Sequence, residues 1–376
     1  MLSGSNEEMA DAPYSAARNR RVMLVNFSGL GNAICISGLM RATGHSELDW
    51  SFFHNACPGL NDDAFCRAAG LDMLHGLYPG IWRRFDRGDW LEIERFLEIN
   101  GIDTIMNLRN EGPDLDVGYA AFKSKHAERL AFFDLFDDAV AGRLGTQNLM
   151  ADWYDLFLRA GARIERPRNW LAGLVGADGA PDGTIGFFPT SSQPVKCWRD
   201  GNWLGLTHLL HMQGRRRFRV VSGILDQERE DAQRLAESMR RRCAAVHVDV
   251  AAYDDTLGFL RALKGLGVLV TNDTAAVHAG AALGITTVGL YLATSGLIWG
   301  GFSPEFTAVQ SAEGLSCPEQ KLYTGNCKLY YSGCPAPCHD SVTPERVAKT
   351  IEAVQPFTLM ELAQTDAGLT SSGEMI

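Results

Sequence analysis

The chain has 376 residues, 46% of them hydrophobic, and a formal net charge of −10. This length is enough for two α/β domains that each bury a full core. The acidic balance argues against a nucleic-acid backbone or an anionic membrane as the main partner, although a local basic pocket can still hold one small anion. Nine cysteines, an odd number, make a framework of disulfides an unlikely design.

The ends of the chain are predicted to lie outside the folded domains. Residues 1–20 are polar with mixed charge and are expected to be disordered, and residues 356–376 form a tail that ends in small polar side chains. The apolar segment after Arg21 is interrupted by Asn26, Ser28 and Gly29, which are poor in a membrane-inserting core. We therefore predict no signal peptide, no transmembrane segment and a cytoplasmic location.

The first half alternates strand and helix patterns. An apolar strand at 22–26, a glycine turn at 27–32 and a helix at 33–41 form the opening unit of a Rossmann-like domain. Gly29 and Gly31 also resemble the start of a dinucleotide fingerprint, but Ile34 stands where the third glycine belongs. A dinucleotide enzyme therefore stays as an alternative.

The alternation continues to the end of this half, with strands at 50–53 and 102–107 and helices at 90–100 and 147–161. Asn110 and Glu111 follow the strand at 102–107, at the sheet edge where open α/β sheets bind ligands. The run Asp114-Leu-Asp116 has the form of a D-x-D metal motif, but its flanks lack the expected strand. We interpret it as a solvated loop, because short motifs often occur by chance.

A Pro/Gly-rich bridge, residues 165–170 and 176–183, marks the domain boundary. The strand at 184–189 leads into a loop, 190–198, that is rich in hydroxyl groups and carries Lys196. Such a loop suits a diphosphate, although an ordinary polar loop with a surface lysine would look the same. After the next strand, at 218–223, Asp226 is the residue expected to bind ribose hydroxyls, with Glu228 in reserve; helix-start acidity is the simpler explanation.

Residues 268–290 read as a strand, a helix and a strand with almost no loop. Asp273 is predicted to cap the helix, whose free amides and dipole would lie at the carboxyl end of a strand. Ala275 leaves room for a ligand, and His278 points a titratable ring to the same place. The alternative is a simple helix cap beside a core histidine. Thr294 and Ser295 follow the second strand and are expected to reach the same ligand.

The pattern N-D-T-x-x-x-H at 272–278 resembles the donor-site signature of the heptosyltransferase-like glycosyltransferases, family 9. Asp273, Thr274, His278 and Gly284 match that signature, whereas Ala275, Gly280 and Thr286 replace its usual Gly, Ala and Pro. The loop at 190–198 also fits the family through Ser191, Ser192, Lys196 and Trp198, with Arg199 in place of Pro. The opening at 28–32 resembles the family's G-x-[LM]-G-D, except that Asn32 replaces the acidic catalytic base.

The resemblance implies a GT-B fold, in which two Rossmann-like parallel-sheet domains face each other across a cleft. Residues 21–175 would form the acceptor domain and residues 184–355 the donor domain. The implied reaction is inverting, metal-independent transfer of a heptose-like or larger sugar from an ADP- or GDP-type nucleotide sugar. The expected donor contacts are Ser191, Ser192, Lys196, Asp226, Asp273, Thr274, Ala275 and His278. The expected substrate contacts are Ser28, Gly29, Gly31 and Asn110 on the facing side, with Thr294 and Ser295 from the donor domain.

Asn32 leaves the chemistry open, because an amide cannot take a proton at neutral pH. The expected catalytic set is Asn32, Lys196, His278 and Glu111. Glu111 would act as a relocated base for a lipopolysaccharide or protein acceptor. A degenerate protein that only binds sugar nucleotides is a second explanation. We favour a third, a small-molecule acceptor that attacks through a soft atom such as sulfur.

Four cysteines cluster late in the chain: Cys317, Cys327, Cys334 and Cys338. Four thiols in so short a span can bind Zn or Fe, and the resemblance adds that one branch of the family holds iron in this region. The spacing lacks the paired C-x-x-C knuckles of a strong metal motif. A cluster of reduced thiols is the alternative, and the oligomeric state cannot be read from the sequence.

Overall fold

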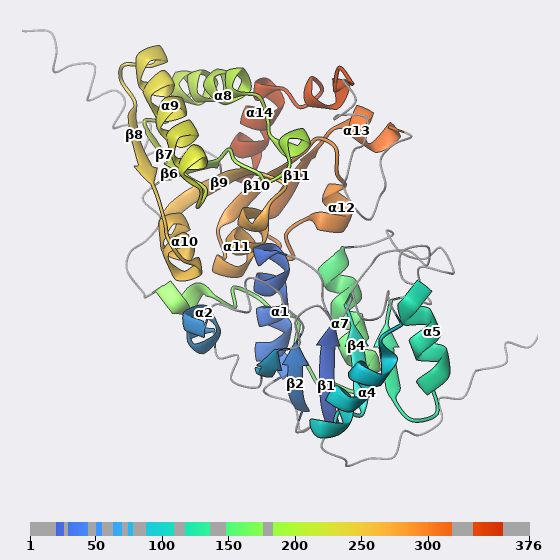
Figure 1. Cartoon of the computed structure of the whole chain (residues 1–376). Coiled ribbons are helices and arrows are strands. Elements are labelled where there is room, and N and C mark those ends of the chain that lie inside the picture. The colour runs from blue at the N-terminus through green and yellow to red at the C-terminus, as the bar shows by residue number, and fades with distance from the viewer. Residues whose placement is uncertain are drawn as a thin grey trace, which may run out of the picture.

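The computed structural model describes residues 20–25, 29–43, 50–54, 63–69, 74–77, 88–108, 117–135, 148–175, 183–317 and 334–355. Within these ranges no helix combines the length and the apolar character needed to cross a membrane. The described elements form two parallel sheets, one in each half of the chain (Figure 1). The α/β class predicted from the sequence is therefore confirmed.

The first sheet has the strand order β3-β2-β1-β4-β5, with every neighbouring pair parallel. Its strands are β1 (Arg20–Val25), β2 (Trp50–His54), β3 (Leu74–Leu77), β4 (Thr104–Asn107) and β5 (Ala131–Asp134). The helices of this half are α1 (Leu30–Thr43), α2 (Asp63–Ala68), α4 (Trp90–Ile99), α5 (Val117–His126) and α7 (Leu149–Arg159), followed by the 3₁₀ turn η3 (Ala172–Val175).

The second sheet has the strand order β11-β10-β9-β6-β7-β8, again all parallel. Its strands are β6 (Thr184–Phe188), β7 (Arg217–Val221), β8 (His247–Ala251), β9 (Leu266–Asn272), β10 (Thr286–Tyr291) and β11 (Phe306–Gln310). The helices are α8 (Asp200–Met212), α9 (Asp226–Arg242), α10 (Thr256–Leu263), α11 (Ala275–Leu283), α12 (Gly296–Trp299), α13 (Ala312–Ser316) and α14 (Pro344–Val354), with 3₁₀ turns η4 (Pro194–Lys196) and η6 (Pro337–His339).

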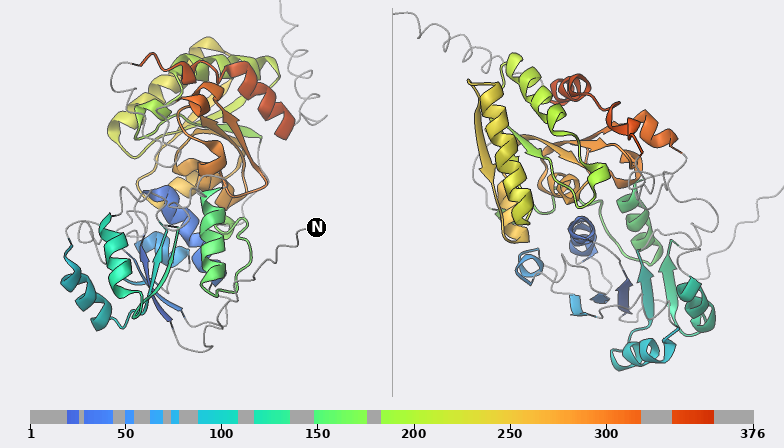
Figure 2. Two further views of the ribbon diagram at one scale, coloured as in Figure 1. Left: turned by 90° about the vertical axis from the view of Figure 1, so that its right-hand side faces the viewer. Right: turned by 45° about the horizontal axis from the view of Figure 1, so that its top comes forward.

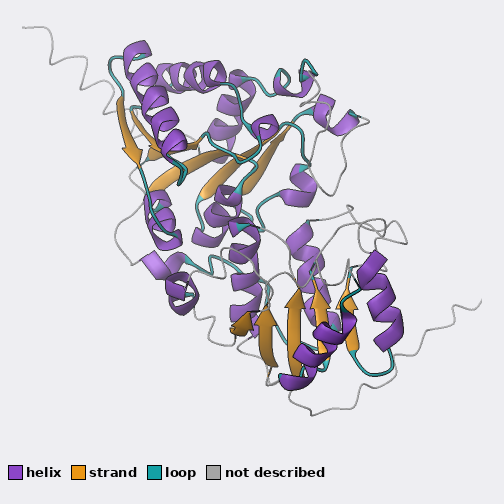
Figure 3. Ribbon diagram, in the orientation of Figure 1, coloured by secondary structure: helices purple, strands orange, loops and turns teal. Residues whose placement is uncertain are grey.

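Side chains alternate along a strand, so each sheet has two faces. Helices cover both faces of each sheet and bury them. Val22 and Leu24 of β1 face one way, and Met23 and Val25 face the other. Helices α4 and α5 cover the outer face of the first sheet, and α8, α9 and α14 cover the outer face of the second. Figure 3 shows helices on both faces of the strands.

The inner faces of the two sheets share a single hydrophobic cluster. It joins α1 and α7 of the first half to α10 and α11 of the second, and Ala276, Ala279 and Ala282 lie in it together with Ile34. Figures 1 and 2 show α1 and α11 between the two sheets. The small side chains of α11 let the two helices approach closely, so the N-terminus of α1 is brought next to the N-terminus of α11.

Trp170 lies in the segment that connects the first sheet to the second and anchors it by hydrogen bonds. Its ring nitrogen donates to the Ile34 carbonyl at 3.0 Å and to Ser37 Oγ at 3.1 Å, so the end of the first half is pinned to α1. The next backbone amide, of Leu171, donates to the Ala282 carbonyl of α11 at 2.9 Å. The crossover is thus bonded to both central helices just before residues 176–182.

Two differences from the predicted elements matter. The first helix starts at Leu30 rather than at residue 33, so Gly31 and Asn32 lie in its first turn and not in a loop. Sequence analysis also did not predict α5, β5, α8 and β11. In α8 the glycines Gly201 and Gly205 weaken the helical pattern, and packing of Trp203 and its neighbours into the core outweighs that low propensity.

Candidate functional site

The strand order fixes where ligands can bind. In the second sheet the chain reverses its direction of winding between β6 and β9, and in the first sheet between β1 and β4. Ligands of open parallel sheets bind beyond the carboxyl ends of the strands at such a reversal. The segments that follow β6 and β9, at 189–198 and 273–274, lie at one reversal, and α1 starts at the other.

A cavity of about 450 Å³ lies where these two reversals meet. It is lined by Gly29, Leu30, Gly31 and Asn32 from the first half, and by Phe188, Thr190, Ser191, Ser192, Gln193, Lys196, Gly223, Ile224, Glu228, Tyr253, Phe259, Asp273, Thr274, Ala275, His278 and Trp299 from the second. The structure therefore brings together most of the residues that the sequence singled out. It also places Asn32 at the same cavity as Lys196 and His278.

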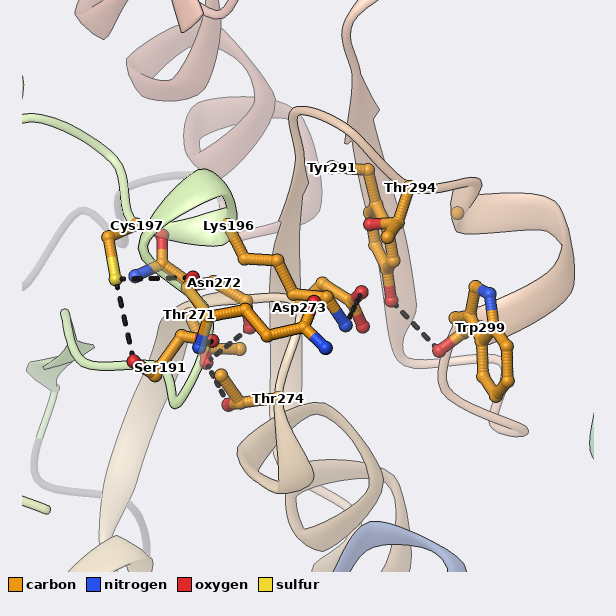
Figure 4. A network of polar contacts seen from close by, with 12 residues as sticks. Ser191, Lys196, Cys197, Thr271, Asn272, Asp273, Thr274, Tyr291, Thr294 and Trp299 are labelled. Atoms are coloured by element: carbon orange, nitrogen blue, oxygen red, sulfur yellow. Dashed lines mark hydrogen bonds and ion pairs between the residues drawn. The ribbon is translucent and has the colours of Figure 1, made fainter. Parts of the chain in front are cut away.

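Lys196 and Asp273 form an ion pair inside the cavity (Figure 4). Lys196 ends the 3₁₀ turn η4, and its Nζ lies 2.9 Å from Asp273 Oδ2. The two side chains are only 18% and 7% exposed, so the pair is largely shielded from water. Because charges attract more strongly where water is excluded, this pair holds the lysine in place beside the start of α11.

The structure corrects the predicted cap of α11. Thr274, not Asp273, is the N-cap: its side-chain oxygen accepts from the Ala276 amide at 3.2 Å. A threonine side chain reaches this amide because Thr274 is the residue directly before the helix, whereas Asp273 is one residue too early. The carboxylate of Asp273 is thus available to Lys196, and the N-terminal amides and positive dipole end of α11 face the same cavity.

His278 lies in the second turn of α11 and is half-buried at the cavity wall. Its Nδ1 has no hydrogen-bond partner among the described residues. Burial, with a smaller contribution from the Lys196 charge, lowers the pKa of His278 to about 4, although the Asp273 carboxylate acts in the opposite direction. The ring is therefore neutral at pH 7 in the unliganded protein, where it offers hydrogen bonds rather than a positive charge.

Gly31 is explained by the contact between α1 and α11. A Cβ atom added to Gly31 would lie 2.9 Å from His278 Cδ2 and 3.4 Å from Ala275 Cα. Only glycine therefore allows the first turn of α1 to approach the first turns of α11 this closely. This close approach accounts for Gly31 without any dinucleotide, which removes half of the motif on which that alternative depends.

Asn272, the last residue of β9, holds both ends of the Lys196 loop. Its amide nitrogen donates to the Pro189 carbonyl at 2.6 Å, and its Oδ1 accepts from the Trp198 amide at 3.1 Å. Between these points Ser191 Oγ accepts from the Gln193 amide at 3.2 Å. The loop at 190–198 is therefore tied to the strand that carries Asp273.

Glu228 rather than Asp226 lines the cavity beyond β7. Asp226 is exposed at the start of α9 and is not among the lining residues. Glu228 is half-buried, and its Oε2 accepts from the Leu225 amide at 3.0 Å, which caps the helix. The Glu228 carboxylate lies directly against Gly223, where a Cβ would displace it. The reserve residue of the sequence analysis thus occupies the expected place.

Aromatic side chains that sequence analysis missed complete the cavity wall. Tyr253 and Phe259 stack at 4.9 Å between ring centroids, and Trp299 lines the opposite part. Burial and the nearby Glu228 carboxylate raise the pKa of Tyr253, so its phenol stays protonated. Tyr253 lies in the segment that follows β8, and applying the carboxyl-end rule to every strand would have found it.

Thr294 and Ser295 are buried and are not among the lining residues. The Thr294 carbonyl accepts from Gln310 Nε2 at 2.9 Å, while its Oγ1 has no hydrogen-bond partner within the described ranges. Figure 4 shows Thr294 beside Tyr291, whose hydroxyl donates to the Trp299 carbonyl at 3.0 Å. In this structure the two residues support the wall that carries Trp299 instead of forming its surface.

Several predicted residues lie outside the described residues: Ser28, Asn110, Glu111, the stretch 114–116 and Cys327. Cys317, Cys334 and Cys338 are described, and each is half-buried. Within the described ranges no three His, Cys, Asp or Glu side chains are grouped so that they could hold a metal ion. With Cys327 outside these ranges, the four-thiol metal site stays a prediction.

Part of the chain matches a family model in sequence, and most of it matches solved structures in fold. Residues 163–326 match the family model of glycosyltransferase family 9 (heptosyltransferase). E. coli heptosyltransferase WaaC with ADP is 17% identical, with a TM-score of 0.57 over 89% of this chain and 99% of that chain. The glycosyl transferase family 9 protein from Veillonella parvula DSM 2008 is 16% identical, with a TM-score of 0.58 over 90% and 98%. E. coli ADP-heptose lps heptosyltransferase II is 16% identical, with a TM-score of 0.51 over 89% and 98%.

No curated protein matches the chain significantly in sequence. The solved structures nevertheless confirm the GT-B fold, and the family model confirms the resemblance to family 9 in the half of the chain that carries Lys196, Asp273 and His278. The shared fold and the family pattern together support a glycosyltransferase.

Proposed function

We propose that this chain, which carries the family 9 pattern over residues 163–326 on a GT-B fold, transfers a sugar from a nucleoside-diphosphate sugar with inversion of configuration. The observation that carries the proposal is the Lys196–Asp273 pair at the N-terminus of α11, at the reversal point of the second sheet. A fixed cation next to free helix amides suits a diphosphate. The cavity also meets Asn32 of the facing domain, where an acceptor would lie.

In this proposal Lys196 leaves Asp273 for the diphosphate of the donor. The amides and dipole of α11 and the ring of His278 supply the remaining donors around the departing phosphates. A bound dianion favours protonated imidazole, so it would raise the pKa of His278 from its low value in the unliganded protein. The side chains thereby stabilise the leaving charge without a divalent ion, and Asp273, released from Lys196, faces the transferred sugar.

The donor is proposed to be of the ADP or GDP type. Two of the similar structures were solved with ADP and with ADP-2-deoxy-2-fluoro heptose, which favours adenine and a heptose-like sugar. Tyr253, Phe259 and Ile224 offer an apolar wall for a base, and Glu228 is placed to accept from ribose hydroxyls in the role first given to Asp226.

The acceptor is proposed to be a small molecule with a soft nucleophile. Asn32 lines the cavity and can position an acceptor by hydrogen bonds, but its amide cannot take the proton of an attacking alcohol. A thiol or thione needs no strong base near neutral pH. Transfer to a lipopolysaccharide or a protein with Glu111 as the base remains the alternative among enzymes, and Asn32 equally favours binding without catalysis.

The experiment measures release of nucleoside diphosphate from ADP- and GDP-sugars in EDTA, with and without paired thiol and alcohol acceptors. We expect acceptor-dependent release that EDTA does not reduce, with the thiol used in preference. Loss of turnover in EDTA that Mg²⁺ restores would contradict the metal-independent proposal.

The variant Asn32→Asp, assayed across pH, separates the acceptor proposals. We expect it to leave thiol transfer nearly unchanged, because the thiolate already carries the charge. Exclusive use of the alcohol, with a strong increase in Asn32→Asp, would overturn the soft-nucleophile proposal. Release that no acceptor stimulates would favour a protein that binds without transfer.

A further inference from the structure

Residues 339–342, far along the chain from the Lys196 loop at 190–198, form hydrogen bonds with that loop. His339, in η6, is 3% exposed, and its Nε2 lies 2.8 Å from the carbonyl oxygen of Val195. Val195 is the residue directly before Lys196, and both belong to η4. A carbonyl can only accept, so Nε2 carries the proton and donates it.

A second bond from the same segment holds the other side of Lys196. Trp198 is 2% exposed, and its ring nitrogen donates to the Val342 carbonyl at 2.7 Å. The segment is itself fixed to the second domain, because Ser341 Oγ lies 2.7 Å from Ser311 Oγ. Residues on both sides of Lys196 are therefore bonded to residues 339–342, Val195 through its backbone carbonyl and Trp198 through its side chain.

These bonds matter because lysine has a long, flexible side chain. Its ammonium group can follow the charge from Asp273 to a phosphate only if the backbone of η4 stays in place. Asn272 fixes the two ends of the loop, but Val195 lies between these ends. Without His339 the buried Val195 carbonyl would lack this donor, which favours rearrangement of the turn.

We propose that His339 is a positioning residue for Lys196. The bond from Trp198 to Val342 is the second contact between the Lys196 loop and residues 339–342. The inference rests on the proposed function, in which Lys196 binds the diphosphate of the donor. It assigns a role to the segment that carries Cys334 and Cys338, and this role needs no metal.

The test measures ADP binding by calorimetry with the full chain. His339→Leu removes the donor and should weaken ADP binding about tenfold, the usual effect of losing one buried hydrogen bond. His339→Gln keeps an N–H that can donate to Val195 and should retain most of the affinity. Asp340→Asn is the matched control, because it removes only the exposed Arg199–Asp340 ion pair one residue away and should change nothing.

A double-mutant cycle separates positioning from general loosening of the domain. If His339 acts through Lys196, adding His339→Leu to Lys196→Ala should cause no further loss of ADP affinity. Fully additive losses, or equal losses in His339→Gln and His339→Leu, would overturn the inference. If thermal unfolding shows that His339→Leu does not fold, Trp198→Phe takes its place in the same cycle.

The outcomes also distinguish the two proposals. A wild-type chain that binds no nucleoside diphosphate contradicts the proposed function and the inference together. A chain that binds ADP through Lys196 but is indifferent to His339→Leu contradicts the inference alone.

Discussion

The two halves of the molecule contribute to one cavity in different ways. The second half supplies its charged and ring-bearing groups, Lys196, Asp273, Glu228 and His278. An ion pair holds Lys196 and Asp273, and a hydrogen bond holds Glu228. The first half supplies the described residues Gly29, Leu30, Gly31 and Asn32, none of which carries a charge. A diphosphate requires fixed charges and amides, whereas an acceptor requires space and alignment, so this contrast is the one that the proposed function requires.

The family match follows the same division, since it spans residues 163–326 and leaves most of the first half unmatched. The two halves are nevertheless joined through the shared hydrophobic cluster of α1 and α11. Substitutions in one half of the cavity at a time therefore test whether the charged groups of the second half and the uncharged residues of the first half contribute separately to function.

The largest expected effect is on stability and comes from His278. Its pKa in the folded protein, about 4, is depressed from the ordinary 6.5, so between these values the unfolded chain binds more protons. The stability that depends on a neutral His278 is complete above pH 6.5 and falls by about 3 kcal/mol on acidification to pH 4. Chemical denaturation of wild type and His278→Gln across this range measures it.

The difference between the two stability curves isolates His278 from the carboxylates that both proteins share. It should narrow steadily as the pH falls from 6.5 to 4. Parallel curves would mean that His278 titrates normally and is not part of the dry, charged side of the cavity.

The second effect is on donor affinity. Lys196→Ala removes a charge-assisted contact and should weaken nucleoside-diphosphate binding by about 1.5–3 kcal/mol, or roughly 10- to 100-fold. It also leaves Asp273 buried without its cation, which lowers stability. Calorimetry on Lys196→Ala and on Lys196→Ala/Asp273→Asn separates the two consequences.

We expect the double variant to recover stability but not affinity. The exposed Lys349 of α14 provides the matched control, since Lys349→Ala removes the same charge far from the loops of the cavity. Equal affinities for the nucleoside diphosphate in all of these proteins would show that Lys196 does not bind it.

The smallest effect is on alignment and comes from Gly31. The methyl group of Gly31→Ala would lie 2.9 Å from His278 Cδ2, so α1 must shift away from α11 and carry Asn32 with it. We expect kcat to fall about tenfold, the effect of misplacing reacting groups slightly, with a smaller change in donor affinity. Gly201→Ala adds the same methyl group where nothing lies within 4 Å and should be silent.

A loss of donor affinity as large as the loss of kcat would show that Gly31 serves the donor side. The first half would then contribute to donor binding as well as to alignment of the acceptor.

The donor side was also easier to predict from sequence, for a physical reason. Lys196, Asp273 and His278 follow long buried strands, where a change from apolar to polar residues marks the carboxyl end of the sheet. Their convergence follows from the strand order, which the alternating pattern suggests. Asp226 was chosen over Glu228 because the sequence cannot show which of two acidic residues turns outward at a helix start.

Other features depended on tertiary contacts that no local pattern reveals. The cap of α11 is Thr274, which directly precedes the helix, and the Asp273 carboxylate pairs instead with Lys196, which lies 77 residues earlier. Gly31 is predicted as a substrate contact and lines the cavity, but its close approach to α11 cannot be read from the local sequence. His339 has no motif around it, and only the fold brings it to the Lys196 loop.

The most direct test of the account is the thermal unfolding midpoint in the presence of nucleotides. A ligand that binds only the folded chain must raise this midpoint. We predict that ADP or GDP raises it, that the corresponding monophosphate raises it less, and that Lys196→Ala abolishes the difference between the two. A midpoint that no nucleoside diphosphate raises, or that NAD raises more, would contradict the donor site described here.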